Sequence, residues 1–180
     1  MNMTRHTSSP SHLSFDIVQR AMGVAVGAAV GDALGAPFEF GPPHLYDEHF
    51  PQPVHTGTGE MIGGGPFPWR PGEFTDDTQM ALCLAESLLA QKCLDPADVF
   101  ARFRTWRRSA VDCGIVTSGA LSHNDHRTAA ELAHRRSGRS ASNGALMRTW
   151  PIALSFIGAD SDAVMSAAVE QAATTHFDPA

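Results

Sequence analysis

An apolar stripe with helical spacing, preceded by three oxygen-bearing side chains, restricts the fold of this chain more than any other feature. Between Asp76 and Gln91, uncharged residues recur every three or four positions, which is the period of one helix face. The stripe comprises Met80, Cys83, Leu84, Ser87, Leu88 and Gln91. We therefore predict a helix over residues 76–91 that packs one face against a core and begins at an acidic turn.

The rest of the chain shows further helical signals and no convincing strand alternation. Asp95 followed by Pro96 is typical of a helix start, and we predict a helix from there to about Arg108. The other predicted helices cover residues 15–34, 128–136, 143–157 with a kink or division at Pro151, and 161–173 with Ser161 as N-cap. A short helical turn is expected near residues 117–120. The fold class is thus all-α, with one domain over residues 15–180 and a disordered tail over residues 1–14.

Four glycines recur at every fourth position of the first predicted helix: Gly23, Gly27, Gly31 and Gly35. Glycine inside a helix costs up to ~1 kcal/mol relative to alanine, so the stripe needs a reason. A strip without side chains lets another backbone approach closely, and we predict tight helix packing at Gly23 and Gly27. Asp32 is expected to cap or pair within this helix rather than to act in catalysis.

A long segment without helical periodicity, residues 38–72, separates the first two predicted helices. It contains the glycine run 63–65 and several prolines, and it carries Glu39, Trp69 and Arg70. A loop of this length inside a compact domain is usually functional or disordered. Two interpretations are open, namely the wall of a binding cleft or irregular surface.

Thr75, Asp76 and Asp77 also admit two interpretations. In the first, Thr75 or Asp76 is only the N-cap of the following helix, where the helix dipole favours acids. In the second, the hydroxyl and the two carboxylates form half of a Mg²⁺ or Ca²⁺ site, since these ions take oxygen ligands. His123 and His126 lack an acid or cysteine at helical spacing, and we do not expect a metal there.

Charge, cysteine content and hydropathy indicate which partners and which cellular compartment to expect. The formal net charge of −6 argues weakly against a nucleic-acid partner, and the arginine clusters at 102–108 and 135–139 lack an aromatic-rich strand motif. Three cysteines without CxxC spacing argue against disulfides or zinc and fit a reducing cytoplasm. The apolar stretch 21–36 is short for a membrane span, contains Asp32 and follows no clear basic region, so we expect neither a membrane segment nor a signal peptide.

Four motifs together resemble the ADP-ribosylglycohydrolase family, and the resemblance covers about residue 20 to the C-terminus. In chain order they are Gly27–Glu39, Gly72–Thr78, Ser142–Arg148 and Thr175–Pro179. Each motif alone carries little weight, but four in the family's order and at similar separations form a specific match. The resemblance implies a compact, all-α orthogonal bundle with two Mg²⁺ ions, or Mn²⁺ in their place. It also implies cleavage of the glycosidic bond between ADP-ribose and a protein side chain or a small acceptor.

The resemblance further implies roles for individual residues. Thr75, Asp76 and Asp77 would be metal ligands, Glu39 would act on the attacking water, and Asp112 would lie near the substrate, although its surrounding residues differ from the family pattern. The substrate side would consist of Ser142, Asn143 and Gly144, which match a loop that contacts the ADP-ribose phosphates, and His176, which matches a histidine near the distal part of the ligand.

These residue types suit the chemistry. Carboxylates near the ribose stabilise the positive charge of an oxocarbenium-like state. A Ser-Asn-Gly turn that opens a helix offers N–H groups to a pyrophosphate, although Asn143 and Gly144 could equally form a simple turn and helix start. Arg148 either pairs with an acid or reaches a phosphate, and both possibilities are open.

A motif of the type Gly-Asp-x-Asp-Thr, which supplies the other half of the family's metal site, is absent from the sequence. We therefore expect a truncated, N-terminal portion of such a protein, arising by truncation, gene splitting or an incomplete sequence. Its helices should expose apolar surface. Three hypotheses follow: a hydrolase that is active only with a C-terminal half, an ADP-ribose-binding fragment without turnover, and an unrelated helical domain whose Thr-Asp-Asp is only a cap.

Overall fold

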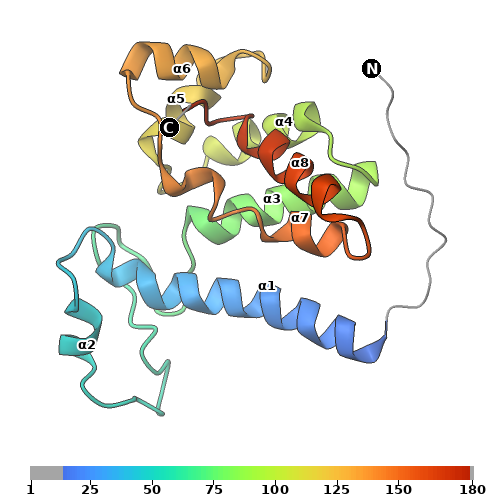
Figure 1. Ribbon diagram of the computed structural model, residues 1–180. Helices are drawn as coiled ribbons and strands as arrows, with labels where there is room; N and C mark the ends of the chain where they lie inside the picture. Colours follow the sequence, from blue (N-terminus) through green and yellow to red (C-terminus); the bar gives the residue numbers. More distant parts are fainter. Residues whose placement is uncertain (1–13, 179–180) are drawn as a thin grey trace.

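The computed structural model describes residues 14–178, and within this range every regular element is helical. Eight α-helices and two short 3₁₀ turns follow one another (Figure 1). The only β contact in the same range is an isolated bridge between Gly64 and Trp69. The predicted all-α class is confirmed. Of the tail predicted over residues 1–14, residues 1–13 lie outside the described residues. The prediction is wrong at Ser14, whose hydroxyl accepts from the backbone N–H of Ile17 and caps α1.

The helix bounds agree best with the sequence where capping signals are strong. In chain order the elements are α1 Phe15–Gly35, η1 Ala36–Phe38, α2 Leu45–His49, α3 Asp76–Gln91, α4 Pro96–Arg107, α5 Ile115–Leu121, α6 Ala129–Ser137, η2 Asn143–Ala145, α7 Trp150–Ser155 and α8 Ser161–Ala172. The Asp95 carboxylate caps α4 by accepting from the backbone N–H of Ala97 at 2.9 Å. At α8 the predicted cap is wrong by one residue, because Asp160 accepts from Ala163 while Ser161 is already helical.

The helix predicted from Asn143 onward is also wrong. The chain forms only the turn η2 there, and α7 begins at Trp150 with Pro151 in its first turn. Proline has no backbone N–H to donate and is tolerated in a first turn. Of the two effects predicted for Pro151, a kink or a division, the structure therefore shows the division, with a separate helix that begins at Trp150.

Helix α3 lies at the centre of the bundle and packs against α1, α4 and α7 (Figure 1). Met80 and Leu84 of α3, Val99 and Phe103 of α4, and Ile152 of α7 have no exposed surface. Burial of each such side chain contributes about 1.5–3 kcal/mol. Helices α5 and α6 pack on each other beyond α4. The stripe seen in the sequence is therefore the surface around which the core forms.

Helix α1 runs along one side of this bundle and is largely exposed (Figure 1). A Cβ added at Gly23 or Gly27 would meet nothing within 4 Å. The predicted tight packing at these glycines is therefore wrong for the described residues. Met22 and Val26 are 55% and 61% exposed, so α1 carries the kind of apolar surface that we expected.

The segment Phe15–Phe38 is long and apolar enough to cross a membrane, with a mean hydropathy of 1.4 over its best window. It is longer than the stretch 21–36, so the argument from length against a span does not hold. Length and composition are weak evidence for a span, because core helices and signal sequences share them. The absence of a membrane segment stays a prediction.

The segment predicted as a loop, residues 38–72, contains the short helix α2 and a cluster of aromatic rings. Phe38 packs edge-on against Tyr46 with 5.3 Å between ring centroids, and the Tyr46 hydroxyl donates to Glu60. Gly65 has a φ of +83°, and a Cβ there would lie 2.8 Å from Pro37. The lack of a side chain at Gly65 therefore lets this segment lie directly against the turn that follows α1.

Candidate active site

The Asp32 carboxylate joins the end of α1 to the start of α3. It accepts hydrogen bonds from the backbone N–H groups of Thr75 and Thr78, both at 3.1 Å. These partners lie 43 and 46 residues further along the chain, so the expectation that Asp32 acts only within its own helix is wrong. Asp32 instead holds in place the turn that carries Asp76 and Asp77.

Thr75 caps this turn, as one of the two interpretations predicted. Its hydroxyl accepts from the backbone N–H of Asp77 at 3.3 Å. Capping and metal binding are compatible in principle, because a hydroxyl oxygen has two lone pairs. The Asp76 side chain contacts a different segment, since its Oδ2 accepts from the backbone N–H of Gly114 at 3.3 Å. That bond brings the segment with Asp112 beside the start of α3.

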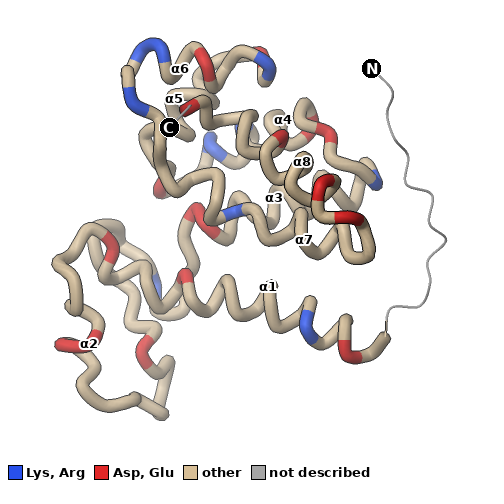
Figure 2. The backbone as a smooth tube through the Cα atoms, viewed as in Figure 1, with Lys and Arg blue, Asp and Glu red and all other residues tan. Residues whose placement is uncertain are grey.

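Four of the predicted site residues, Glu39, Asp76, Asp77 and Asp112, lie close enough together for their charges to interact. Figure 2 shows acidic positions gathered where the end of α1 meets the start of α3. Among residues 14–178, none of these four forms an ion pair with a basic side chain. Within the described residues, therefore, no ion pair neutralises the negative charge of the site.

Burial raises the pKa of each acid, and neighbouring negative charge further raises the pKa of Glu39, Asp76 and Asp77. Burial first, and then Asp32 and Asp76, raises the pKa of Asp77 to about 6. Burial and the neighbouring Asp112 raise the pKa of Asp76, and burial raises that of Asp112. Glu39 lies at the exposed rim, yet the surrounding protein and the charge of Asp112 raise its pKa to about 7.

The donor chemistry fits a hard divalent cation, because every polar side chain at this turn offers oxygen and no ion pair within the described residues neutralises the carboxylates. The present arrangement is not a closed coordination shell, however. Within the described part of the chain, no group of three or more His, Cys, Asp or Glu side chains is close enough together to hold a metal. Thr75, Asp76 and Asp77 therefore stay predicted ligands.

The predicted substrate residues form a second cluster. Ser142 and Asn143 are exposed, and the Ser142 Oγ lies 2.8 Å from Nε2 of His176. Ahead of this loop, the backbone N–H of Ser140 donates to the Asp178 carboxylate at 3.0 Å. The chain end that carries His176 is thus fastened at two points to the Ser142 loop. The helix start expected there is missing, so the phosphate interaction would depend on side chains and loop N–H groups.

Gly144 allows this close contact. A Cβ on Gly144 would lie 2.8 Å from Oγ1 of Thr117 and 3.2 Å from Nε2 of His176. Thr117 comes from α5, is 1% exposed, and its hydroxyl has no hydrogen-bond partner within residues 14–178. Sequence reasoning missed Thr117, because no motif marks it.

Helix α5 connects the two clusters. Gly114, the residue directly before α5, donates to Asp76, and Thr117 in the first turn lies against Gly144. The acidic turn of α3 and the Ser142 loop are therefore brought together, although 65 residues or more separate most of their members in sequence. No spacing rule could have placed them side by side.

Arg148 takes neither role considered for it from the sequence. It is fully buried, donates to Gln171 and Thr175, and lies over the Phe103 ring at 4.5 Å from the ring centroid. Burial lowers the pKa of Arg148 to about 9. Among the described residues no acid hydrogen-bonds to it.

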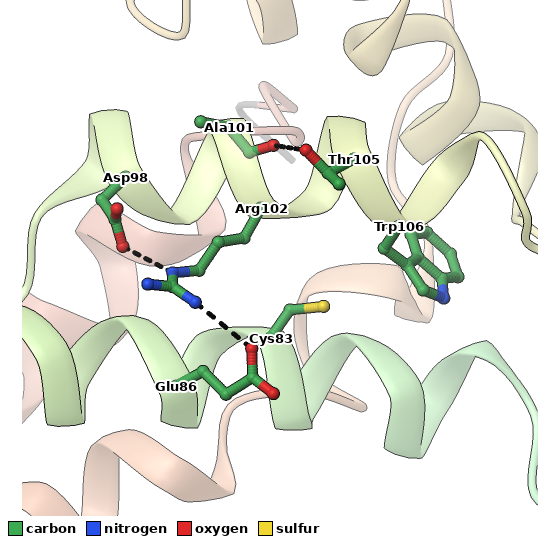
Figure 3. A pocket seen from close by; sticks show the side chains of 7 residues that line it. All are labelled: Cys83, Glu86, Asp98, Ala101, Arg102, Thr105 and Trp106. Carbon is green, nitrogen blue, oxygen red and sulfur yellow. Dashed lines mark hydrogen bonds and ion pairs between the residues drawn. The ribbon is translucent and has the colours of Figure 1, made fainter.

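A groove of about 390 Å³ between α3 and α4 lies apart from both clusters (Figure 3). Arg102 crosses it and is already paired with Asp98 at 2.7 Å and with Glu86 at 3.2 Å. At one end, Trp106 donates to Oε1 of Gln79 at 2.7 Å. These side chains satisfy one another, so the groove is better explained by helix packing than by ligand binding.

Comparisons with known proteins show the family of the chain. A sequence model of the ADP-ribosylglycohydrolase family matches residues 14–180. An ADP-ribosyl-[dinitrogen reductase] glycohydrolase from Rhodospirillum rubrum is 37% identical over 161 residues, which make up 89% of this chain and 52% of that relative. An ADP-ribosylarginine hydrolase Tri1 from Serratia proteamaculans is 38% identical over 112 residues, or 58% of this chain and 28% of the relative.

A solved structure described as an ADP-ribosylglycohydrolase-related protein complex has the same fold. It matches with a TM-score of 0.64 and 35% identity over 89% of this chain and 50% of its own. The chain thus spans about half the length of the first of these relatives and of the solved structure.

Proposed function

The chain belongs to the ADP-ribosylglycohydrolase family, and from this premise we propose that it takes part in hydrolysing the glycosidic bond between ADP-ribose and an acceptor. The observation that supports this best is the link through α5, which sets the carboxylates of α3 beside the loop of Ser142. A substrate with a ribose and a diphosphate needs both clusters. The acceptor would be a side chain of an ADP-ribosylated protein or a small molecule, and a cytoplasmic site of action is part of the proposal.

We assign the hydrolytic roles to the acids at the rim. Glu39 is exposed, so water reaches it, and its carboxylate would take the proton of the attacking water. Asp112 is half-buried and would stabilise positive charge that develops on the ribose as the glycosidic bond breaks. Both roles need an ionised carboxylate with access to the ribose.

Thr75, Asp76 and Asp77 would hold divalent cations, two Mg²⁺ or Mn²⁺ ions. Their oxygen donors and the negative charge of the neighbouring acids support this assignment. When bound, such ions would supply positive charge that orients the ribose hydroxyls and lowers the pKa of water. The contribution of the chain itself is to hold the two aspartates on a turn fixed by Asp32.

The substrate loop would bind the diphosphate. Ser142 and Asn143 are exposed and carry polar groups that can donate to phosphate oxygens. His176 contacts this loop and would lie near the distal part of the ligand. Gly144 leaves room for the His176 ring at the backbone of the loop.

A second candidate function is ADP-ribose binding without turnover. It is favoured by one observation, that no three His, Cys, Asp or Glu side chains within residues 14–178 are grouped closely enough to hold a metal. An ADP-ribose-binding surface needs the Ser142 loop but not a complete metal centre, so binding could persist where hydrolysis is absent.

A titration and a turnover assay separate the two functions. ADP-ribose is titrated calorimetrically into the 180-residue chain with Mg²⁺ and with EDTA, and release of ADP-ribose from ADP-ribosylarginine is followed by chromatography. Asp76→Asn tests the acidic turn, and Asp162→Asn, in the exposed first turn of α8, is the matched control. Release that needs Mg²⁺ and Asp76 supports hydrolysis, binding without release supports the second function, and neither binding nor release rejects both.

A further inference from the structure

Four residues form a continuous chain of hydrogen bonds from the core to the substrate loop. Nη2 of Arg148 donates to Oγ1 of Thr175 at 2.7 Å. Oγ1 of Thr175 lies 2.8 Å from Nδ1 of His176, and Nε2 of the same ring lies 2.8 Å from Oγ of Ser142. Arg148 and Thr175 have no exposed surface, whereas Ser142 is exposed.

The chemistry of these groups fixes the direction of each bond. A guanidinium only donates, so the Thr175 oxygen accepts from Arg148. The Thr175 hydroxyl hydrogen is buried and needs an acceptor, and within the described residues Nδ1 of His176 is the one acceptor within reach. Nδ1 therefore accepts and carries no proton.

The protonation state of the His176 ring also fixes the direction of its hydrogen bond with Ser142. Burial and the charge of Arg148, the cation that faces the ring, lower the pKa of His176 to about 4, so the ring is neutral at physiological pH. A neutral imidazole has one N–H, and because Nδ1 accepts, that N–H is on Nε2 and donates to Ser142. The Ser142 oxygen then acts as the acceptor, and its own hydrogen is left for another partner.

We propose that Arg148 is a positioning residue that acts through Thr175 and His176 to leave the exposed Ser142 hydroxyl as a donor toward an anionic oxygen of the ligand. Phosphate oxygens only accept, so a hydroxyl held as a donor selects for them. The ligand class, the diphosphate of ADP-ribose, rests on the proposed function, whereas the direction of the hydrogen bonds rests on the geometry alone.

The surroundings of Arg148 and His176 limit other arrangements. Gln171 accepts from Nε of Arg148 at 3.0 Å, which fixes the plane of the guanidinium. The His176 ring lies against the backbone of Gly144, where a Cβ would be 3.1 Å from its Cε1 atom. The ring therefore has little room to rotate, and each nitrogen keeps its partner.

Nitrogen-15 NMR of the histidine-labelled chain tests the direction without any ligand. We expect His176 to show one tautomer, protonated at Nε2, which does not take up a second proton between about pH 8 and pH 5. Thr175→Val removes the donor to Nδ1 and should produce a mixture of tautomers, whereas Thr175→Ser retains a hydroxyl and should restore the Nε2–H form. Thermal melting confirms that each variant folds. A wild-type ring protonated at Nδ1 would overturn the proposal.

Calorimetric titration with ADP-ribose tests the consequence at Ser142. We expect Thr175→Val to weaken binding by about tenfold, with Thr175→Ser within about twofold of the wild type. Thr105→Val, a matched change on the exposed face of α4, controls for the loss of a threonine hydroxyl. Unchanged affinity in a Thr175→Val chain whose tautomer has shifted would reject the coupling to the ligand.

The two measurements separate failure of the proposal from failure of the proposed function. A wild-type chain with the Nε2–H tautomer but no affinity for ADP-ribose would reject the proposed function and support the hydrogen-bond direction. Binding of ADP-ribose together with the Nδ1–H tautomer would support the proposed function and reject this inference.

Discussion

The hydroxyl of Thr78 donates a hydrogen bond of 2.6 Å to Oδ2 of Asp32, and the backbone N–H of Thr78 donates to the same oxygen at 3.1 Å. One carboxylate on α1 therefore fixes the first turn of α3. The aspartates proposed to bind metal lie on that turn, so their positions depend on a residue more than forty positions earlier in the chain.

Replacement of Asp32 by alanine should lower the free energy of unfolding by about 2–4 kcal/mol, because it leaves buried donors on Thr75 and Thr78 without partners. Thr78→Val removes only the hydroxyl bond and should cost about 1–2 kcal/mol. Urea denaturation of both single variants and the double variant measures the coupling. Strictly additive losses would show that the two residues do not act together.

Asp77→Asn should stabilise the metal-free chain at about pH 8 and abolish stabilisation by Mg²⁺. The fold raises the pKa of Asp77 from 3.8 to about 6. The ionised carboxylate therefore lowers the free energy of unfolding, and this cost grows as the pH rises through that range and is complete above about 6. Removal of the charge should therefore add about 1–2 kcal/mol at pH 8 in EDTA and nothing below about pH 4. Thermal melts with EDTA and with Mg²⁺ measure both effects, and an equal Mg²⁺ response in the two proteins would argue against Asp77 as a ligand.

Two glycine substitutions should have opposite effects on stability. Gly144→Ala places a methyl group 2.8 Å from Oγ1 of Thr117 and should cost about 1–3 kcal/mol and weaken ADP-ribose binding. Gly27→Ala meets nothing within 4 Å in α1 and should add about 0.5–1 kcal/mol through helix propensity. Thermal denaturation compares them. A loss of stability in Gly27→Ala would indicate that the face of α1 is packed in solution.

His176 should make stability depend on pH on the acidic side. The fold lowers its pKa to about 4, from an ordinary value of 6.5, so the unfolded chain takes up the proton first as the pH falls. The stabilisation from the neutral ring is complete above 6.5 and is lost progressively between 6.5 and about 4. Over that window, the wild type should lose on the order of 2–3 kcal/mol more than His176→Asn.

The raised pKa values of Glu39 and Asp77 give the opposite slope, because their stabilising effect falls as the pH rises. The wild type and His176→Asn share this contribution to the slope of stability against pH. Only the difference between their two curves therefore reports on His176. Parallel curves of unfolding free energy against pH, measured in urea, would contradict the burial of a neutral ring.

Local signals in the sequence determined the helices that have clear starts and one buried face. Asp95 with Pro96 gave the start of α4, and the stripe after Thr75 gave the full extent of α3. These features depend on hydrogen bonds between residues about four positions apart, so the order of residues is sufficient to predict them. The four motifs, in their order, likewise led to the family that the comparisons show.

Contacts between distant segments were decided only by the tertiary structure. The sequence could not show that Asp32 holds α3, that Thr117 lies against Gly144, or that the buried Arg148 donates to Thr175. It also suggested close packing at Gly23 and Gly27, where no neighbour is present among the described residues. The physical reason is that the residue type determines which bonds a side chain can form, whereas the packing of the helices determines which partner comes within reach.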